Sequence, residues 1–209
     1  GDAVCQTAHR ADCPFPQEMR YELPGLVIDN CAMAGRSSKT FREEGRLDDI
    51  AAHIRPGDLL VVSFGHNDAN RAKAERYVSA DAFGESLRPF WDAARSHGAV
   101  CIFASPVAMR EFDEAGVCHP SFAAYREAMR AFAAEVGAPF IDLGAATAAA
   151  NTALGAERCK TRYMWVGAKQ DNAHQQNAGA CRTAQAFVQQ LYRIPPRHWM
   201  CCGRISNKF

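Results

Sequence analysis

The sequence lacks long hydrophobic runs, an excess of charge of either sign, and the short motifs that bind nucleotides or zinc. No apolar run reaches the ~18 consecutive residues that can span a bilayer. A formal net charge of +1 provides no basic stripe for nucleic acid. The patterns G-x-G-x-x-G, G-x-x-x-x-G-K-S/T and H-E-x-x-H do not occur. We therefore expect no membrane partner, no nucleic-acid partner and no bound dinucleotide.

Cysteine is present in an odd number, nine residues, and no two of them form a C-x-x-C pair. Cys31 and Cys101 lie in or beside strand-like runs, where a small buried hydrophobic side chain packs well. We expect mostly free or buried thiols. If the protein is exported, Cys5–Cys13 is the disulfide to expect. The cysteines leave the cellular compartment open.

Apolar runs and amphipathic segments alternate along the 209 residues, of which 48% are hydrophobic. That size and composition predict one domain with a sizeable core. The alternation predicts an α/β domain over residues 1–192, with a parallel sheet covered by helices on both faces. Residues 193–209 contain adjacent prolines and adjacent cysteines without a usable period, which predicts an irregular tail. Strands are predicted at residues 26–28, 59–64, 100–103 and 139–143, and helices at 17–23, 41–54, 83–96, 121–136 and 178–192.

Two polar turns follow buried strands, at the place where open α/β sheets bind their ligands. The first is Ala34-Gly35-Arg36-Ser37-Ser38, and the second is Phe64-Gly65-His66-Asn67-Asp68. A third polar block, Asp171-Asn172-Ala173-His174, precedes the last predicted helix. We expect these blocks to form the functional site.

The first two blocks, with Phe41, Glu44-Gly45-Arg46-Leu47 and Ile54-x-Pro56-Gly57-Asp58 between them, resemble the SGNH (GDSL-type) hydrolases. Within that family the sequence is most similar to the rhamnogalacturonan acetylesterase-like branch, from about residue 25 to residue 191. The resemblance implies a flavodoxin-like three-layer α/β/α fold with a central parallel sheet. It also implies no cofactor and an acetylated carbohydrate as substrate. It favours a secreted or periplasmic location, although no signal peptide opens this chain.

By this resemblance, Gly35 and Asn67 supply donors to the oxyanion of an acyl-transfer reaction. Preorganised donors around that oxygen usually make the largest catalytic contribution. The family's third donor is the backbone N–H of the nucleophile. Taken singly, Gly35 also fits a residue that only permits a turn, and Asn67 one that only caps the next segment.

The Asp171-x-x-His174 block matches the family's general base and the carboxylate that orients it. With two residues between them, both side chains can come from one loop before the last helix. Gln175 and Gln176 depart from the Leu and Asn that are usual after this histidine. A merely structural His174 is the alternative.

The nucleophile position departs from the family. The family reads Gly-Asp-Ser, whereas this chain opens Gly1-Asp2-Ala3, and an alanine cannot form an acyl-enzyme. The alanine can be engineered, natural, or the result of an alignment offset, because the family often has one more residue before the following Val-Cys. The family's first strand precedes Gly-Asp-Ser, so the resemblance also predicts that this strand is absent from the chain.

The sequence therefore predicts a carbohydrate esterase that removes acetyl groups from a polysaccharide such as rhamnogalacturonan, pectin or xylan, impaired at Ala3. A non-catalytic carbohydrate-binding protein and a structural fragment are the alternatives.

Other residues have two interpretations each. Arg71, Lys73 and Arg76 can meet an acidic sugar or form a solvated face. Tyr163, Met164 and Trp165 can stack on a sugar or pack in the core. His66, Asp68 and His174 lack a supporting metal motif, so no metal is expected.

Overall fold

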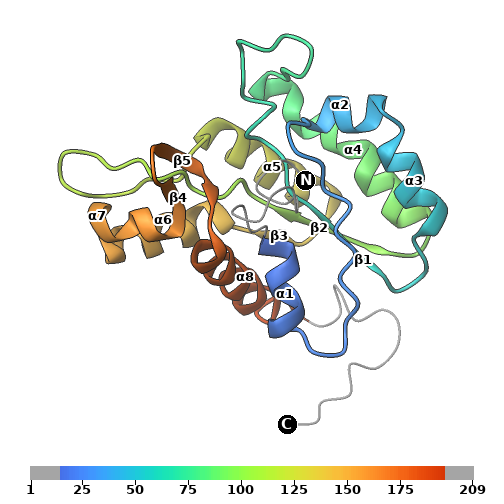
Figure 1. The fold of residues 1–209 in the computed structure, drawn as a ribbon. Coiled ribbons are helices and arrows are strands. Elements are labelled where there is room, and N and C mark those ends of the chain that lie inside the picture. Colours follow the sequence, from blue (N-terminus) through green and yellow to red (C-terminus); the bar gives the residue numbers. More distant parts are fainter. Residues whose placement is uncertain (1–14, 196–209) are drawn as a thin grey trace.

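Three short parallel strands form the centre of the computed structural model, which describes residues 15–195 (Figure 1). They are β1 (Leu59–Val62), β2 (Val100–Ala104) and β3 (Phe140–Ile141), in the order β1-β2-β3. β1 pairs with β2 from Leu59↔Val100 onwards, and β2 pairs with β3 at Phe103↔Phe140. Their apolar sequences are those expected of strands covered on both faces.

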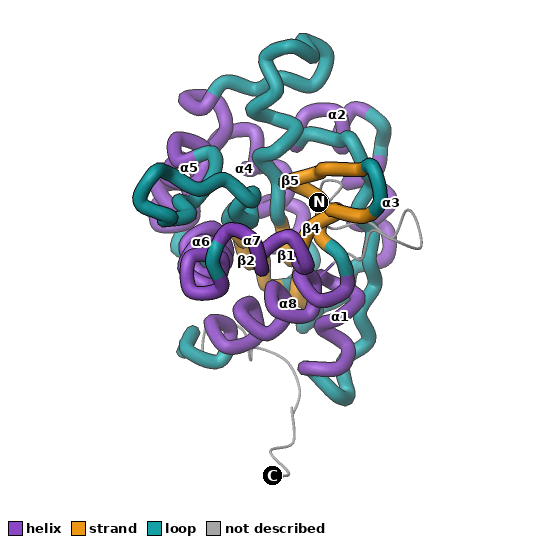
Figure 2. Tube along the Cα trace, turned by 60° about the vertical axis from the view of Figure 1, so that its left-hand side comes forward, coloured by secondary structure: helices purple, strands orange, loops and turns teal. Residues whose placement is uncertain are grey.

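Helices cover both faces of this sheet. On one face lie α1 (Phe15–Glu22) and α8 (Asn177–Leu191), side by side in Figures 1 and 2. On the other lie α4 (Ala80–Ser96) and α5 (Ala123–Val136). The side chains of β2 alternate between the two cores: Ile102 packs with the α1–α8 cluster, and Cys101 and Phe103 pack with the α4–α5 cluster. The predicted three-layer α/β/α fold is confirmed.

The predicted helix over residues 41–54 is two helices, α2 (Ser38–Glu43) and α3 (Arg46–His53). Gly45 separates them, with a φ of 74° that an L side chain rarely adopts. Ser37 caps α2 in a capping box with Thr40. The helical period of the apolar residues continues through this break, which is why the sequence suggested one helix.

The predicted strand at residues 26–28 is not formed, and this prediction was wrong. Residues 26–30 are irregular, and Val27 is 97% exposed. A strand requires a hydrogen-bonded neighbour, and within the described residues the sheet ends at β1. A cavity of about 770 Å³ is lined both by residues 26–32 and by β1. The predicted lack of a first strand concerns the chain before residue 15, outside the described residues.

The region after β3 was not predicted correctly. The predicted strand 139–143 contains only two strand residues, because the Asp142 carboxylate accepts the Ala145 N–H (3.1 Å) and caps α6 (Leu143–Leu154). α6 is rich in alanine and has no polar stripe that would have revealed it. Next come α7 (Ala156–Cys159), a 3₁₀ turn (Lys160–Arg162), and a hairpin of β4 (Tyr163–Val166) and β5 (Lys169–Gln175), which forms a separate sheet to the left of the parallel strands in Figure 1.

The five cysteines in the described part of the chain all carry free thiols, as expected: Cys31, Cys101, Cys118, Cys159 and Cys181. Cys5 and Cys13 lie outside the described residues, as does the predicted tail beyond residue 195. Between residues 15 and 195, no helix has both the length and the apolar character to cross a membrane.

Candidate active site

The turn at Gly35 brings together the two predicted oxyanion residues. Gly35 has a φ of 75°, and each of three successive carbonyl oxygens accepts a side-chain hydrogen bond. The Ala34 oxygen accepts from Arg36 Nη1 (2.9 Å), and the Gly35 oxygen from Arg76 Nη1 (2.9 Å). The Arg36 oxygen accepts from Asn67 Nδ2 (3.2 Å). The Asn67 amide is therefore held one residue away from Gly35.

The Asp68 carboxylate joins the two turns by hydrogen bonds. This fully buried carboxylate accepts hydrogen bonds from the Ser38 N–H (2.9 Å) and hydroxyl (2.6 Å), and from the Gly65 N–H (3.0 Å). Because both oxygens bind protein donors, Asp68 acts as a structural link. His66, on the same turn, was the other residue considered as a metal ligand. Its ring packs edge-on against the Phe122 ring, with the two ring centroids 4.9 Å apart.

Asp171 and His174 lie in strand β5, where the sequence predicted a loop. The pairing of β4 and β5 shifts register: Trp165 is opposite Gln170, but Tyr163 is opposite Gln175. The extra β5 residues bulge outward. Asp171 Oδ1 accepts the N–H groups of Ala173 (2.8 Å) and His174 (2.9 Å), which closes an Asx turn. This turn brings the two side chains together, so that Asp171 Oδ2 lies 2.7 Å from His174 Nδ1.

Asp171 is ionised at neutral pH. Burial works to raise the pKa of Asp171, but hydrogen bonds from the His174 and Ala173 N–H groups outweigh it, and the pKa lies below its ordinary value. An ionised carboxylate only accepts hydrogen bonds, so a neutral His174 carries its proton on Nδ1 and keeps a lone pair on Nε2. The His174 side chain is 35% exposed, and it can meet a substrate from solvent.

Asn172, between these two residues, anchors the hairpin. Its side-chain oxygen accepts from Trp165 Nε1 (2.9 Å) and Arg110 Nη1 (3.3 Å), and its carbonyl accepts the Arg110 N–H (2.7 Å). Two cations lie over the Trp165 ring: the Arg110 guanidinium carbon is 4.7 Å from the ring centroid, and Lys160 Nζ is 4.8 Å from it. Tyr163 and Met164 are buried. Core packing therefore accounts for Tyr163 and Met164, whereas Trp165 is half-buried beside two cations. No spacing in the sequence indicated Arg110.

A second His–Asp pair has the same separation. His119 Nε2 lies 2.7 Å from Asp113 Oδ2, in the irregular segment between β2 and α5. The side chains of His119 and Asp113 are 67% and 40% exposed, whereas those of His174 and Asp171 are 35% and 20% exposed. Distance alone does not distinguish the two pairs. Backbone hydrogen bonds do not distinguish them either, because Asp113 Oδ1 accepts the Val117 N–H (2.8 Å). The deeper burial of Asp171 and His174 does distinguish them, because it restricts the orientation of the imidazole.

Of the three cations that follow Asn67, only Arg76 turns inward. Arg71 and Lys73 are exposed, and Arg71 lies over the Tyr77 ring. Arg76 is half-buried on the Gly35 carbonyl. Arg76 is therefore not part of a solvated face, whereas the exposure of Arg71 and Lys73 fits that interpretation.

The predicted site residues form two pairs. Gly35 and Asn67 meet through the Arg36 carbonyl, and Asp171 bonds directly to His174. Between residues 15 and 195, no hydrogen bond or ion pair joins one pair to the other. The 770 Å³ cavity beside β1 is lined by none of these four residues. The predicted nucleophile position, Ala3, lies outside the described residues.

Several known proteins are similar to this chain in sequence and in fold. Rhamnogalacturonan acetylesterase RhgT of Bacillus subtilis is 36% identical over 179 residues, which cover 81% of this chain and 76% of RhgT. The probable rhamnogalacturonan acetylesterase YesY of the same organism is 39% identical over 170 residues, covering 81% and 78% of the two chains. The crystal structure of B. subtilis YxiM superposes with a TM-score of 0.83 at 27% identity, covering 92% of this chain and 55% of that longer one.

The model of the GDSL-like lipase/acylhydrolase family matches residues 1–181, a range that includes both residue pairs and position 3. This match confirms the resemblance that the strand-end motifs indicated, and the chain belongs to the GDSL-like lipase/acylhydrolase family.

Proposed function

We propose that this chain is a carbohydrate acetylesterase whose site is built for Ser-His-Asp hydrolysis of acetyl esters on a polysaccharide. The observation that carries the proposal is the Asp171–His174 pair, held at 2.7 Å with Nε2 of the imidazole directed away from the carboxylate. The names of RhgT and YesY support a pectin-type substrate rich in rhamnogalacturonan.

In the proposed reaction, a serine at position 3 loses its proton to His174 Nε2 as its oxygen attacks the acetyl carbonyl carbon. The tetrahedral intermediate collapses when the same proton passes to the departing sugar oxygen, which leaves an acetyl-enzyme. Water, deprotonated by His174, then releases acetate and restores the serine. Asp171 keeps the imidazole oriented and stabilises its protonated form.

The oxyanion of both intermediates would be bound by Gly35 and Asn67, together with the position-3 N–H. The Gly35 N–H makes no hydrogen bond within the described residues. The Asn67 amide carries two hydrogens and donates one to the Arg36 carbonyl, which leaves the second for substrate. Donors fixed before the reaction need no reorganisation as charge develops.

Alanine at position 3 removes the attacking oxygen. Without it, what is left is the oxyanion donors and water activated by His174. Enzymes of this type that lack a triad member retain only about 10³–10⁴-fold acceleration over water. We expect the chain with Ala3 to be slower than a serine-containing relative by several orders of magnitude.

The test is acetate release from acetylated pectin and xylan oligosaccharides by the chain as it stands and by Ala3→Ser. We expect a large gain in kcat for Ala3→Ser and none for Val4→Ser, the matched control for an alignment offset of one residue. If both serine variants stay folded and neither releases acetate, the esterase proposal is wrong. Sugar binding that is unchanged by the serine would then favour the non-catalytic carbohydrate-binding alternative.

A further inference from the structure

Two guanidinium groups hold the peptide groups on either side of Gly35 from their carbonyl ends. Arg36 Nη1 binds the Ala34 oxygen and Arg76 Nη1 binds the Gly35 oxygen, both at 2.9 Å. Both peptides are trans, and in a trans peptide the N–H points opposite to the C=O. Fixing the Ala34 oxygen therefore fixes the direction of the Gly35 N–H. Fixing the Gly35 oxygen does the same for the Arg36 N–H.

The rest of the turn shows which N–H groups remain available. The Ser37 N–H donates to Thr40 Oγ1 (3.0 Å) and the Ser38 N–H to Asp68 Oδ1 (2.9 Å). Within the described residues, the Gly35 and Arg36 N–H groups donate to nothing. Hence the two donors left over are the two whose carbonyl partners are clamped by arginine.

The two arginines are themselves held differently. Arg36 Nε lies 2.9 and 3.0 Å from the two oxygens of Glu44, which also pairs with Arg46 at 2.7 Å. Arg76 pairs with no carboxylate of the described residues, and its Nε is buried without a hydrogen-bond partner there. Within the described residues, the hydrogen bond to the Gly35 carbonyl is therefore the one polar contact that holds the Arg76 guanidinium.

We propose that Arg36 and Arg76 are positioning residues that orient the Gly35 peptide toward the oxyanion, a role that rests on the proposed esterase function. Gly35 suits this clamp because its φ of 75° is one that L side chains rarely adopt. Neither arginine touches the reacting atoms. Each acts through a backbone carbonyl.

The experiment compares Arg36→Met and Arg76→Met with two matched controls, all in the Ala3→Ser background. Arg46→Met loses the same charge beside the same Glu44 but touches no carbonyl of the turn. Arg71→Met loses the same charge on the same loop as Arg76. We expect kcat to fall about 10- to 100-fold in the two test variants with KM within about threefold, since the Gly35 N–H binds only developing charge. The controls should keep the parent kcat.

Lysine variants separate positioning from folding. Arg76→Lys keeps a charge and an ammonium that can donate to the Gly35 carbonyl, so it should recover part of the kcat lost in Arg76→Met. If both methionine variants and both controls share the same kcat, the positioning role is overturned. If Arg76→Met unfolds, Arg36→Met decides: a kcat equal to that of Arg46→Met would overturn the positioning role.

A second readout does not depend on activity. In the chain as it stands, we expect the Gly35 amide signal in ¹⁵N-resolved NMR spectra to move in Arg36→Met and Arg76→Met and to stay in place in Arg46→Met and Arg71→Met. Inactivity of Ala3→Ser combined with that pattern would refute the esterase while leaving the clamp intact. An unmoved Gly35 signal would refute the clamp.

Discussion

Asp171 performs two tasks with two oxygens. Oδ1 accepts the Ala173 and His174 N–H groups and shapes the bulge, while Oδ2 accepts from the imidazole. The two tasks can be separated by an asparagine, which keeps one acceptor oxygen and replaces the other with an amide. An amide facing Nδ1 donates instead of accepting, so the imidazole proton moves to Nε2 and the base is lost.

We expect Asp171→Asn, in the Ala3→Ser background, to lower kcat for acetate release by about 10²–10⁴-fold. The free energy of unfolding should change little, because the Asx turn survives. Asp113→Asn is the matched control, since it alters a carboxylate at the same 2.7 Å from a histidine. A kcat for Asp171→Asn equal to that of Asp113→Asn would assign His174 a structural role only.

At the residue scale, the motifs predicted the four residues to which the proposed function gives reactive or donor atoms, namely Gly35, Asn67, Asp171 and His174, and the structure pairs them two by two. Arg110 was not predicted as part of the site, and Arg76 was considered only as a contact to an acidic sugar or as part of a solvated face. Both side chains donate to a backbone carbonyl that is far away in the sequence, Gly35 for Arg76 and Ala156 for Arg110. A contact with a backbone oxygen imposes no residue type on its partner, so it leaves no pattern in a single sequence.

Gly179 sets how closely α8 approaches the chain before the hairpin. A Cβ at this position would lie 2.2 Å from the Arg162 carbonyl oxygen. The same oxygen accepts the Gln176 N–H (2.9 Å), which joins the 3₁₀ turn before β4 to the residue that precedes α8. An alanine at position 179 must push these two backbone segments apart, and α8 begins three residues after His174.

We expect Gly179→Ala to reduce the free energy of unfolding by about 2 kcal/mol or more, although alanine in a helix normally gains about 1 kcal/mol over glycine. Urea unfolding measures the change. Ala178→Gly, at the exposed neighbouring position, is the control and should cost no more than about 1 kcal/mol through helix propensity alone. A Gly179→Ala protein more stable than the parent would show that the segments separate without strain.

Elements with a clear hydrophobic period were predictable, and those whose formation depends on a neighbour were not. β1, β2, α4, α5 and α8 appear within a few residues of their predicted positions. The apolar residues 26–28 look like a strand in isolation but have no paired neighbour in the described structure. The β4–β5 hairpin was missed because its bulge interrupts the alternation that identifies strands.

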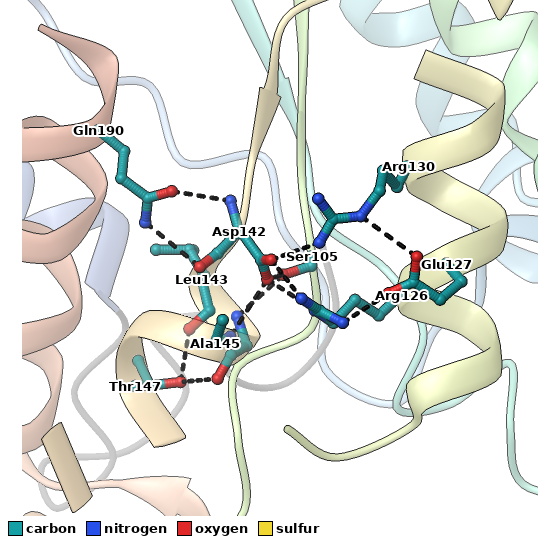
Figure 3. Close-up of polar contacts among 10 residues, drawn as sticks. Ser105, Arg126, Glu127, Arg130, Asp142, Leu143, Ala145, Thr147 and Gln190 are labelled. Carbon is teal, nitrogen blue, oxygen red and sulfur yellow. Dashed lines mark hydrogen bonds and ion pairs between the residues drawn. The ribbon is translucent and has the colours of Figure 1, made fainter. Parts of the chain in front are cut away.

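Across the whole molecule, Asp142 joins the two helical layers through the sheet (Figure 3). Its carboxylate binds Arg126 and Arg130 of α5, with the shortest contacts at 2.5 and 2.6 Å, and the Ser105 hydroxyl at 3.1 Å. Its backbone N–H and C=O bind the Gln190 side chain of α8. Burial works to raise the pKa of Asp142, but hydrogen bonds from Arg126 and the Ala145 N–H dominate and lower it to about 2.

A lowered pKa makes this junction dependent on pH. The unfolded chain titrates Asp142 near its ordinary value of 3.8, so the ionised carboxylate stabilises the fold above that pH and loses its effect as the pH falls toward about 2. We expect Asp142→Asn to reduce the free energy of unfolding by about 1–2 kcal/mol at pH 7. The difference from the parent should disappear near pH 2.

Urea unfolding at several pH values measures this difference. Glu85→Gln removes an exposed partner of Arg88 and is the control that should leave stability unchanged at each pH. A parent–Asp142→Asn difference that persisted undiminished down to pH 2 would mean that lost packing, and not lost charge, accounts for the effect.

The two residue pairs of the site come from opposite halves of the chain, with the exposed segment around Gly116 between them. Under the proposed function, the half before that segment carries the oxyanion donors Gly35 and Asn67, and the half after it carries the base His174. The proposed mechanism needs both, so in an active Ala3→Ser protein catalysis would be a signal that both halves are present and docked. A chain opened near Gly116 would then serve as a split reporter whose output is acetate.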